Sequence, residues 1–379
     1  MGVEIKKVCS RRELRKFVLF GEKLYRGNPY YVPAIVFDEM NTLDHRKNPA
    51  AEFSDFELYL AYKDGKLAGR VAAIINYKAN ATWKHNEVRF GWIDFIDDPQ
   101  VCEALIRAVE QFGEAHGMSE IAGPLGFTDF DPEGLLIEGF DQLGTMPIRY
   151  NHPYYKDRLE ELGFEKDADW YEFRFTLPDA VPEKVSRVAG IVRSRGGYRV
   201  RQLSRKMIKR EDYAHKLFKL MGETYKDLYE YTVLPMNLAD KYIGFYLSIL
   251  DLRYISVVEN DRGELIAFGI TMPSIARALQ KSRGRLLPFG WWPLVHDLFI
   301  KHSDGAELML IGVHPDYRNS GVNALLMEDI FKKFLQMGVK WADSNAQLED
   351  NLPIQNQFEV FRPVRNKIRR SYKKKIQTR

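Results

Sequence analysis

Cysteine is scarce in this sequence: Cys9 and Cys102 are the two among 379 residues. They are too few for a disulfide framework, and neither stands in a CxxC pair or in a Cys/His spacing that would hold zinc, so the sequence predicts no metal site. Two free thiols fit a reducing compartment, and we expect the protein in the cytoplasm.

Long apolar runs are also missing. The most apolar window, residues 286–300, contains two prolines, a glycine, a histidine and an aspartate, and it is shorter than the ~20 residues of a membrane-spanning helix. The basic residues near the N-terminus are not followed by an apolar stretch, so no signal peptide is expected. We therefore expect no membrane span.

Several common catalytic motifs are absent as well. No GxGxxG follows an expected strand, and GxxxxGK[ST], HExxH and GxSxG do not occur, which excludes the commonest nucleotide-binding, zinc-protease and serine-hydrolase classes. The composition is that of a globular protein, with 45% apolar and 28% charged residues, and the length favours two domains.

Positive charge is concentrated at the C-terminal end. The net charge is +4, but residues 362–379 hold nine Lys or Arg and no acid, which leaves −5 for the rest of the chain. This end could contact nucleic acid, an anionic lipid or a phosphorylated ligand, or it could be a solvated edge strand whose lysines prevent edge-to-edge pairing. We favour the edge strand and do not expect nucleic acid as a partner.

One pattern occurs twice along the chain. A strand at 3–8, a helix at 11–25 and a hairpin at 56–77 recur as a strand at 198–203, a helix at 211–229 and a hairpin at 254–272. A strand at 88–96, a helix at 101–115 and a strand at 120–123 then correspond to 307–313, 322–337 and 339–343. The second half therefore repeats the order of elements in the first.

This order predicts the fold class. Strand, helix, hairpin, strand, helix and strand in each half give a mixed sheet with helices on its faces, which is an α/β fold. Gly117 and Gly338 follow the later helix of each copy, where a left-handed C-cap favours glycine. A stretch rich in proline and glycine at 178–198 predicts the boundary, so we expect two domains, residues 1–190 and 191–379.

The two copies differ at the turn between the later strand and helix. In the first copy it is short and contains Asp97 and Asp98, whereas the second has H-P-D-Y-R-N-S-G at 314–321, about three residues longer. A helix N-terminus offers unpaired N–H groups, glycine lets a ligand approach the backbone, and Arg318 adds a cation. The second turn therefore predicts an anion site, while two carboxylates in the first would repel phosphate.

A family resemblance lies in residues 308–324, L-M-L-I-G-V-H-P-D-Y-R-N-S-G-V-N-A, which precede an amphipathic helix. They resemble the coenzyme-A signature of the GNAT acyltransferase superfamily, V-x-P-x-Y-R-x-x-G-x-G/A. Through the repeat, the chain resembles a tandem GNAT protein in which only the C-terminal copy keeps the pyrophosphate loop. The resemblance implies two tandem acyl-CoA N-acyltransferase-like domains, the first of them degenerate.

The resemblance also implies a co-substrate, acetyl-coenzyme A or another acyl-coenzyme A, in the second domain. Main-chain amides from Asn319 to Ala324 would hold its pyrophosphate, with Arg318 shaping the loop, and main-chain groups near Ile311 would pair with the pantetheine arm. Asn351 matches an asparagine that opens the last helix in the family and contacts the cofactor, but it is equally a good N-cap. The implied cofactor-binding residues are Ile311, Gly312, Val313, Arg318, Asn319, Ser320, Gly321, Val322, Asn323, Ala324 and Asn351. Asn323 departs from the usual glycine or alanine.

The acid and the base are less clear. Phe358 stands where the family commonly places a tyrosine that protonates the leaving thiolate. Phenylalanine has no proton to give, so another group or water does this work, or the site transfers nothing. Candidate bases are Glu307, Asp343 and Glu349, each of which is also explained as a surface or capping carboxylate.

The expected function is transfer of an acyl group, most simply acetyl, to a small-molecule amine or a peptide near the C-terminal domain. Two alternatives remain open. One is an acyl-coenzyme-A-binding protein without turnover, favoured by Phe358. The other is an aminoacyl or fatty-acyl transferase on the same scaffold, prompted by the apolar insert at 286–295, which could line an acceptor or acyl-chain pocket or plug a core.

Overall fold

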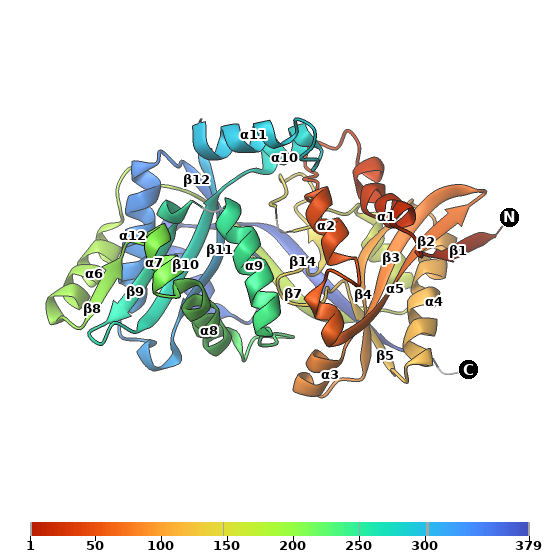
Figure 1. Cartoon of the computed structure of the whole chain (residues 1–379), viewed down its shortest axis with the longest axis horizontal. Coiled ribbons are helices and arrows are strands. Elements are labelled where there is room, and N and C mark those ends of the chain that lie inside the picture. Colours follow the sequence, from red (N-terminus) through yellow and green to blue (C-terminus); the bar gives the residue numbers. More distant parts are fainter. Residues whose placement is uncertain (1, 147, 250, 301–302, 378–379) are drawn as a thin grey trace. The chain divides into compact units, whose positions relative to one another are not determined.

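The chain forms two compact units, neither of which is a contiguous piece of the sequence. The computed structural model describes residues 2–146, 148–249, 251–300 and 303–377. Unit 1 comprises residues 1–171, 276–294 and 366–379, and unit 2 comprises residues 172–275 and 295–365. Figure 1 colours the chain by sequence, so the segments of each unit can be followed by their labels. The division into two contiguous domains, 1–190 and 191–379, rests on the sequence repeat and stays a prediction.

Unit 1 is built on a mixed sheet. Its strands, in spatial order, are β1 (Val3–Lys7), β2 (Ser54–Lys63), β3 (Lys66–Asn76), β4 (Glu87–Phe95), β5 (Glu120–Gly123), β14 (Val364–Lys375) and β7 (Glu165–Thr176), of which β14 contributes residues 366–375 and β7 residues 165–171. Strand β6 (Leu135–Glu138) pairs with β14. The helices are α1 (Arg11–Leu24), α2 (Val36–Thr42), η1 (Pro49–Glu52), α3 (Tyr77–Trp83), α4 (Pro99–Ala115), α5 (Tyr154–Glu161), α10 (Ala276–Ser282) and most of α11 (Trp291–Val295).

Unit 2 repeats this plan. Its strands, in spatial order, are β8 (Tyr198–Arg201), β9 (Ile255–Asn260), β10 (Leu265–Pro273), β11 (Gly305–Val313), β12 (Trp341–Ser344) and residues 172–176 of β7. Strand β13 (Gln347–Leu348) follows β12 in the chain. The helices are α6 (Glu183–Arg195), α7 (Arg205–Arg210), α8 (Tyr213–Tyr225), α9 (Met236–Ile249), η2 (Leu252–Tyr254), η3 (His296–Ile300), η4 (Pro315–Tyr317), α12 (Val322–Gln336), α13 (Leu352–Phe358) and η5 (Glu359–Phe361).

The local signals explain these elements. The β2–β3 hairpin turns at Asp64 and Gly65, whose φ angles of 50° and 74° are those of the two-residue turn that matches strand twist. In both units the later helix buries the apolar face expected from its spacing; on α12 this face includes Val322, Leu326 and Ile330. The α/β expectation is confirmed.

The position of the basic C-terminal strand differs from the one expected from the sequence. Strand β14 is not a solvated edge strand, because it lies between β5 and β7 in the sheet of unit 1. Arg370 makes two hydrogen bonds of 2.7 and 2.9 Å to the Asp169 carboxylate, and Lys374 lies 2.6 Å from Glu110. The interpretation of this segment as a solvated edge strand is therefore wrong. The sequence did not reveal this, because the acidic partners of the strand come from distant parts of the chain. Thr378 and Arg379 lie outside the described residues.

The apolar insert does not plug a core. Leu287, Phe289, Trp291 and Trp292 are exposed, and of this stretch Leu294 is buried. None of the helices in the described part of the chain combines the length and the apolar composition that crossing a bilayer requires.

Candidate functional site

The sheet of unit 2 opens between β11 and β12. The two strands pair in parallel only from Gly305–Trp341 to Leu308–Ser344. At the same level β11 has a bulge at Met309, because Leu308 pairs with Thr271 of β10 and Leu310 pairs with the adjacent Ile270. Beyond this point Ile311, Gly312 and Val313 are paired with β10 but not with β12. Their other edge is the position at which a pantetheine arm is expected.

The turn between β11 and α12 presents main-chain donors. Asn319 and Gly321 have positive φ angles of 65° and 86°, and Gly321 is the N-cap residue of α12. The N-cap residue has no side chain to cap the helix and the Ser320 hydroxyl accepts from the Val322 amide at 3.4 Å, while among the described residues the amides of Asn319 and Gly321 donate no hydrogen bond there. A helix of 15 residues that starts in this way carries partial positive charge and free donors at its N-terminus, which is the chemistry of an anion site.

Gly321 is required by packing inside unit 2. A Cβ atom built on Gly321 would lie 2.6 Å from Cγ2 of Val192 on α6. The sequence argument assigned this glycine to the close approach of a ligand, but the direction of its missing side chain is filled by α6. In the turn Asp316, Arg318 and Asn319 are exposed, and Ser320, Gly321 and Asn323 are half-buried.

The C-terminal end of α8 holds the strand and the turn through three consecutive residues. Glu223 lies 3.2 Å from Nε2 of His314, and the carbonyl of Thr224 accepts a 3.2 Å hydrogen bond from Arg318. Tyr225 then contacts Ile311: its hydroxyl donates to the Ile311 carbonyl at 2.8 Å and accepts from the Ile311 amide at 3.0 Å. Burial raises the pKa of Tyr225 above its ordinary value, so this hydroxyl stays protonated.

Sequence reasoning missed these three residues. They are separated from their partners by 86 to 94 residues, and nothing in their local pattern distinguishes them from other positions at the end of a helix. Their contacts also determine which main-chain groups are available to the diphosphate and to the pantetheine arm of acyl-coenzyme A. The turn offers free donors for a diphosphate, whereas the main chain of Ile311 is occupied and would accept a pantetheine amide only if Tyr225 moved away.

The candidate bases have different surroundings. Glu307 is buried on β11, two residues before the bulge, and accepts a 2.9 Å hydrogen bond from the Ser274 hydroxyl. Asp343, beside it on β12, is locked in two hydrogen bonds of 2.7 and 2.6 Å from Arg174. Both oxygens of this carboxylate are therefore occupied by the guanidinium. Glu349 is half-buried between β13 and α13.

Two residues at α13, Asn351 and Phe358, concern the cofactor contact and the proton donor that the sequence left open. Asn351 is the N-cap residue of α13, yet its side chain makes no capping hydrogen bond. Phe358 is 3% exposed and stacks on Phe175, with ring centroids 5.4 Å apart. Phe358 therefore belongs to the core of unit 2, and a proton for a leaving thiolate must come from elsewhere.

Unit 1 fills the corresponding place with its own side chain. Asp98 is the N-cap residue of α4 and accepts hydrogen bonds from the amides of Gln100 at 3.0 Å and Val101 at 3.4 Å, and it also pairs with Lys63. Although burial opposes it, the Lys63 contact and the amide donors hold the pKa of Asp98 below its ordinary value. This helix start is thus already neutralised by an internal anion.

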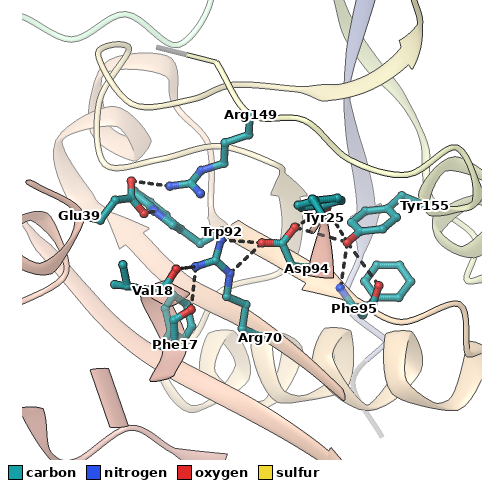
Figure 2. Close-up of polar contacts among 10 residues, drawn as sticks. All are labelled: Phe17, Val18, Tyr25, Glu39, Arg70, Trp92, Asp94, Phe95, Arg149 and Tyr155. Carbon is teal, nitrogen blue, oxygen red and sulfur yellow. Dashed lines mark hydrogen bonds and ion pairs between the residues drawn. The ribbon is translucent and has the colours of Figure 1, made fainter. Parts of the chain in front are cut away.

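Strand β4 of unit 1 carries a buried polar network instead (Figure 2). Asp94 accepts hydrogen bonds from the Tyr25 hydroxyl at 2.6 Å and from Nε of Arg70 at 2.8 Å. Arg70 also donates to the carbonyl of Phe17 at 2.8 Å. Burial and the neighbouring Asp94 raise the pKa of Tyr25, which keeps its proton for this bond. These contacts connect α1, β3 and β4.

A second part of the same network surrounds Glu39. It accepts hydrogen bonds from Nε1 of Trp92 at 2.9 Å and from Arg149 at 2.5 Å (Figure 2). Trp92 has a φ of 48°, in the left-handed region, at the bulge of β4. The charged groups named here form ion pairs with one another, so we interpret the network as a structural element that holds unit 1 together.

Comparison with known sequences gives two relatives. No protein-family model matches the chain. It is 28% identical over 381 residues to Protein YghO of Escherichia coli strain K12, and the alignment covers 98% of this chain and 95% of that protein. It is 26% identical over 317 residues to the bacterial ceramide synthase of Caulobacter vibrioides, with 83% of this chain and 81% of that protein covered.

Solved structures resemble the chain over its whole length. A tandem GNAT protein from the clavulanic acid biosynthesis pathway has a TM-score of 0.59 at 12% identity, covering 100% of this chain and 99% of that one. A GCN5-related N-acetyltransferase from Sphaerobacter thermophilus has a TM-score of 0.52 at 10% identity, covering 99% and 96%. At such low identity these likenesses show the fold alone, and they confirm the expectation of a tandem GNAT fold.

Proposed function

We propose that this chain, which has a tandem GNAT fold, transfers an acyl group from acyl-coenzyme A, bound by unit 2, to an amine. The observation that carries the proposal is the contrast between the two helix starts. In unit 1 the carboxylate of Asp98 caps α4, whereas the N-cap residue of α12 in unit 2 is Gly321, which has no side chain, and among the described residues the amides of Asn319 and Gly321 are left as donors. A diphosphate would complete these donors.

The proposed reaction needs one proton acceptor and one proton donor. The amine nitrogen attacks the thioester carbonyl carbon, a C–N bond forms and the C–S bond breaks. The amine loses a proton and the departing sulfur gains one, so the products are an amide and free coenzyme A. Correct placement of amine and thioester supplies much of the acceleration.

We assign Glu307 as the group that takes the proton. Its side chain is buried near the end of the β11–β12 pairing and accepts a hydrogen bond from the Ser274 hydroxyl, whereas both carboxylate oxygens of Asp343 are bound by Arg174. An extended strand rises about 3.3 Å per residue, so Glu307 lies about 7 Å along β11 from the bulge at Met309, near the point where the pairing with β12 ends.

Among acyl donors we favour a long chain, with a lipid amine as acceptor, over acetyl. One observation supports this choice: one relative is by its name a ceramide synthase, and a ceramide is an N-acylated long-chain amine. Acetyl transfer to a small polar amine remains the simplest alternative.

Binding of coenzyme A tests the site independently of turnover. The variant Asn323→Asp places a carboxylate in the first turn of α12, where the helix dipole favours it, so the fold is not weakened. We expect calorimetric affinity for coenzyme A to fall at least about fivefold, because two unit charges about 4 Å apart repel by at least about 1 kcal/mol. Asn323→Gln is the neutral control and should bind as the unchanged protein does. Equal affinity of all three would contradict the site.

Turnover separates the enzyme from a binding protein. The protein is incubated with palmitoyl- or acetyl-coenzyme A and with either sphinganine or a small polar amine, and the products are analysed by mass spectrometry. We expect the N-palmitoyl amide of sphinganine as the main product. Binding of coenzyme A without any amide product would favour a non-catalytic role, for which the buried position of Phe358 is the supporting observation.

A further inference from the structure

The segment from Lys281 to Trp292 exposes large apolar side chains. Leu287 is 81% exposed and Phe289 79%, and Trp292 and Trp291 are exposed by 52% and 44%. Single exposed apolar residues are common on protein surfaces, but four within six residues form a patch that marks an interaction site.

This segment is held firmly against unit 1. The carbonyl of Gly284 accepts a 2.9 Å hydrogen bond from the amide of Val36, and the Gln280 side chain donates to the carbonyls of Pro29 at 2.8 Å and Tyr31 at 2.9 Å. Gly284 has a φ of 67°, and a Cβ atom there would lie 2.0 Å from the carbonyl oxygen of Ala34. The chain is therefore fixed to unit 1 directly before the exposed aromatic side chains.

A further apolar residue extends the patch onto α2. Phe37, directly after the anchored Val36, is 65% exposed. Gln280 of α10 is bonded to Pro29 and Tyr31 in the loop that connects α1 and α2. Residues 281–292 together with Phe37 are called the aromatic patch below.

The charge of the patch identifies the kind of surface it fits. Residues 276–294 contain four basic side chains and no acidic one. These four are all exposed: Arg277, Lys281, Arg283 and Arg285. Tryptophan and phenylalanine settle at the headgroup level of a bilayer, and neighbouring Arg and Lys are attracted to the phosphates of anionic lipids.

We propose that the aromatic patch docks this protein on the surface of an anionic lipid bilayer. Phe289, Trp291 and Trp292 enter the headgroup region, and Arg283 and Arg285 bind lipid phosphates. A protein partner would also bury aromatic residues. Within 281–292 the patch carries three cations and no acid, of which Arg285 lies 3.5 Å from Glu22 of α1, and this excess of positive charge matches a plane of phosphates better than a mixed protein surface. The inference goes beyond the proposed function: it states where a lipid amine or acyl chain would be met, and it rests on the patch itself.

Vesicle binding without any acyl substrate tests the proposal, so that its failure is distinguishable from a failure of the proposed function. Sedimentation is measured with vesicles of equal parts phosphatidylcholine and phosphatidylglycerol, and with vesicles of phosphatidylcholine alone. We expect binding to the anionic vesicles that weakens with salt, and much weaker binding to the neutral ones.

Two variants test separately the apolar and the electrostatic contributions to membrane docking. Phe289→Glu should lower partitioning at least about tenfold, because it replaces an inserted ring by a charge. The pair Arg283→Glu and Arg285→Glu should lower it at least about twentyfold, since each basic residue near an anionic surface is worth about fivefold. The matched control is Ile191→Glu, at a residue of α6 that is 47% exposed and lies outside the patch.

The outcomes are decisive in both directions. Circular dichroism confirms that each variant is folded, and all changed side chains are exposed. Loss of binding in both patch variants with retention in Ile191→Glu supports the proposal. If the unchanged protein does not sediment with anionic vesicles, or if Phe289→Glu binds as well as the control, the patch is not a membrane surface, and a protein partner becomes the explanation to pursue.

Discussion

The hydroxyl of Tyr225 satisfies both main-chain groups of Ile311, donating to its carbonyl at 2.8 Å and accepting from its amide at 3.0 Å. One side chain from α8 thus occupies the edge of β11 that is not paired with β12. Because the pantetheine arm is expected to bind at this edge, arm and hydroxyl compete for the same two groups. The proposed site is therefore closed at this point by Tyr225.

Tyr225→Phe should therefore tighten the binding of coenzyme A. The variant removes two hydrogen bonds that must break before the arm binds, and a bond of this kind contributes about 1 kcal/mol, so we expect the Kd to fall at least about fivefold. The free protein should melt at a lower temperature, because the Ile311 groups lose their partner. Calorimetry and thermal unfolding measure the two effects. An unchanged Kd would mean that the arm does not reach Ile311.

Glu307→Gln should abolish most of the turnover without unfolding the protein. Glutamine keeps an oxygen that accepts from Ser274 but cannot take a proton. We expect kcat to fall about 100-fold or more, the usual contribution of a general base. Asp343→Asn is the comparison, since it disrupts the contact with Arg174 and should lower stability more than kcat. A Glu307→Gln variant with nearly normal kcat would remove Glu307 from the mechanism.

Asp94→Asn should strongly destabilise unit 1. Arg70 is 2% exposed, and loss of the Asp94 charge leaves its guanidinium buried without a counter-ion. We expect a loss of about 3–5 kcal/mol in the free energy of unfolding, measured with urea. In the double variant with Arg70→Met the buried cation is gone, so the loss should be smaller than the sum of the single changes. Additive losses would show that the two side chains do not act as a pair.

His215 should make the contact between α8 and α9 sensitive to pH. The hydrogen bond with Asp212, and then that with Asp240, raise the pKa of His215 above its ordinary value. Its contribution to stability is therefore complete below about pH 6.5, the unfolded pKa, and is lost as the pH rises through the higher folded pKa. The difference in melting temperature between the unchanged protein and His215→Gln should be largest near pH 6 and shrink at alkaline pH. A difference independent of pH would contradict this.

The amino-acid sequence alone determined the repeated order of strands and helices. The helix predicted at 322–337 is Val322–Gln336, and the strand predicted at 120–123 is Glu120–Gly123. Such elements follow from apolar periodicity and from glycine at turns and C-caps, which are properties of neighbouring residues. The turn at 314–321 was visible for the same reason, because a glycine at a helix start next to a basic residue is a local pattern.

Only the tertiary structure decided which distant residues meet. The basic strand β14 lies inside the sheet of unit 1 because acids such as Asp169 neutralise it, although the two are 201 residues apart. The same holds for Tyr225 at Ile311, for Val192 against Gly321 and for the exposure of the aromatic patch. Pairing and burial across long stretches of chain depend on how whole elements pack, and periodicity within one element carries no information about the partner it will find.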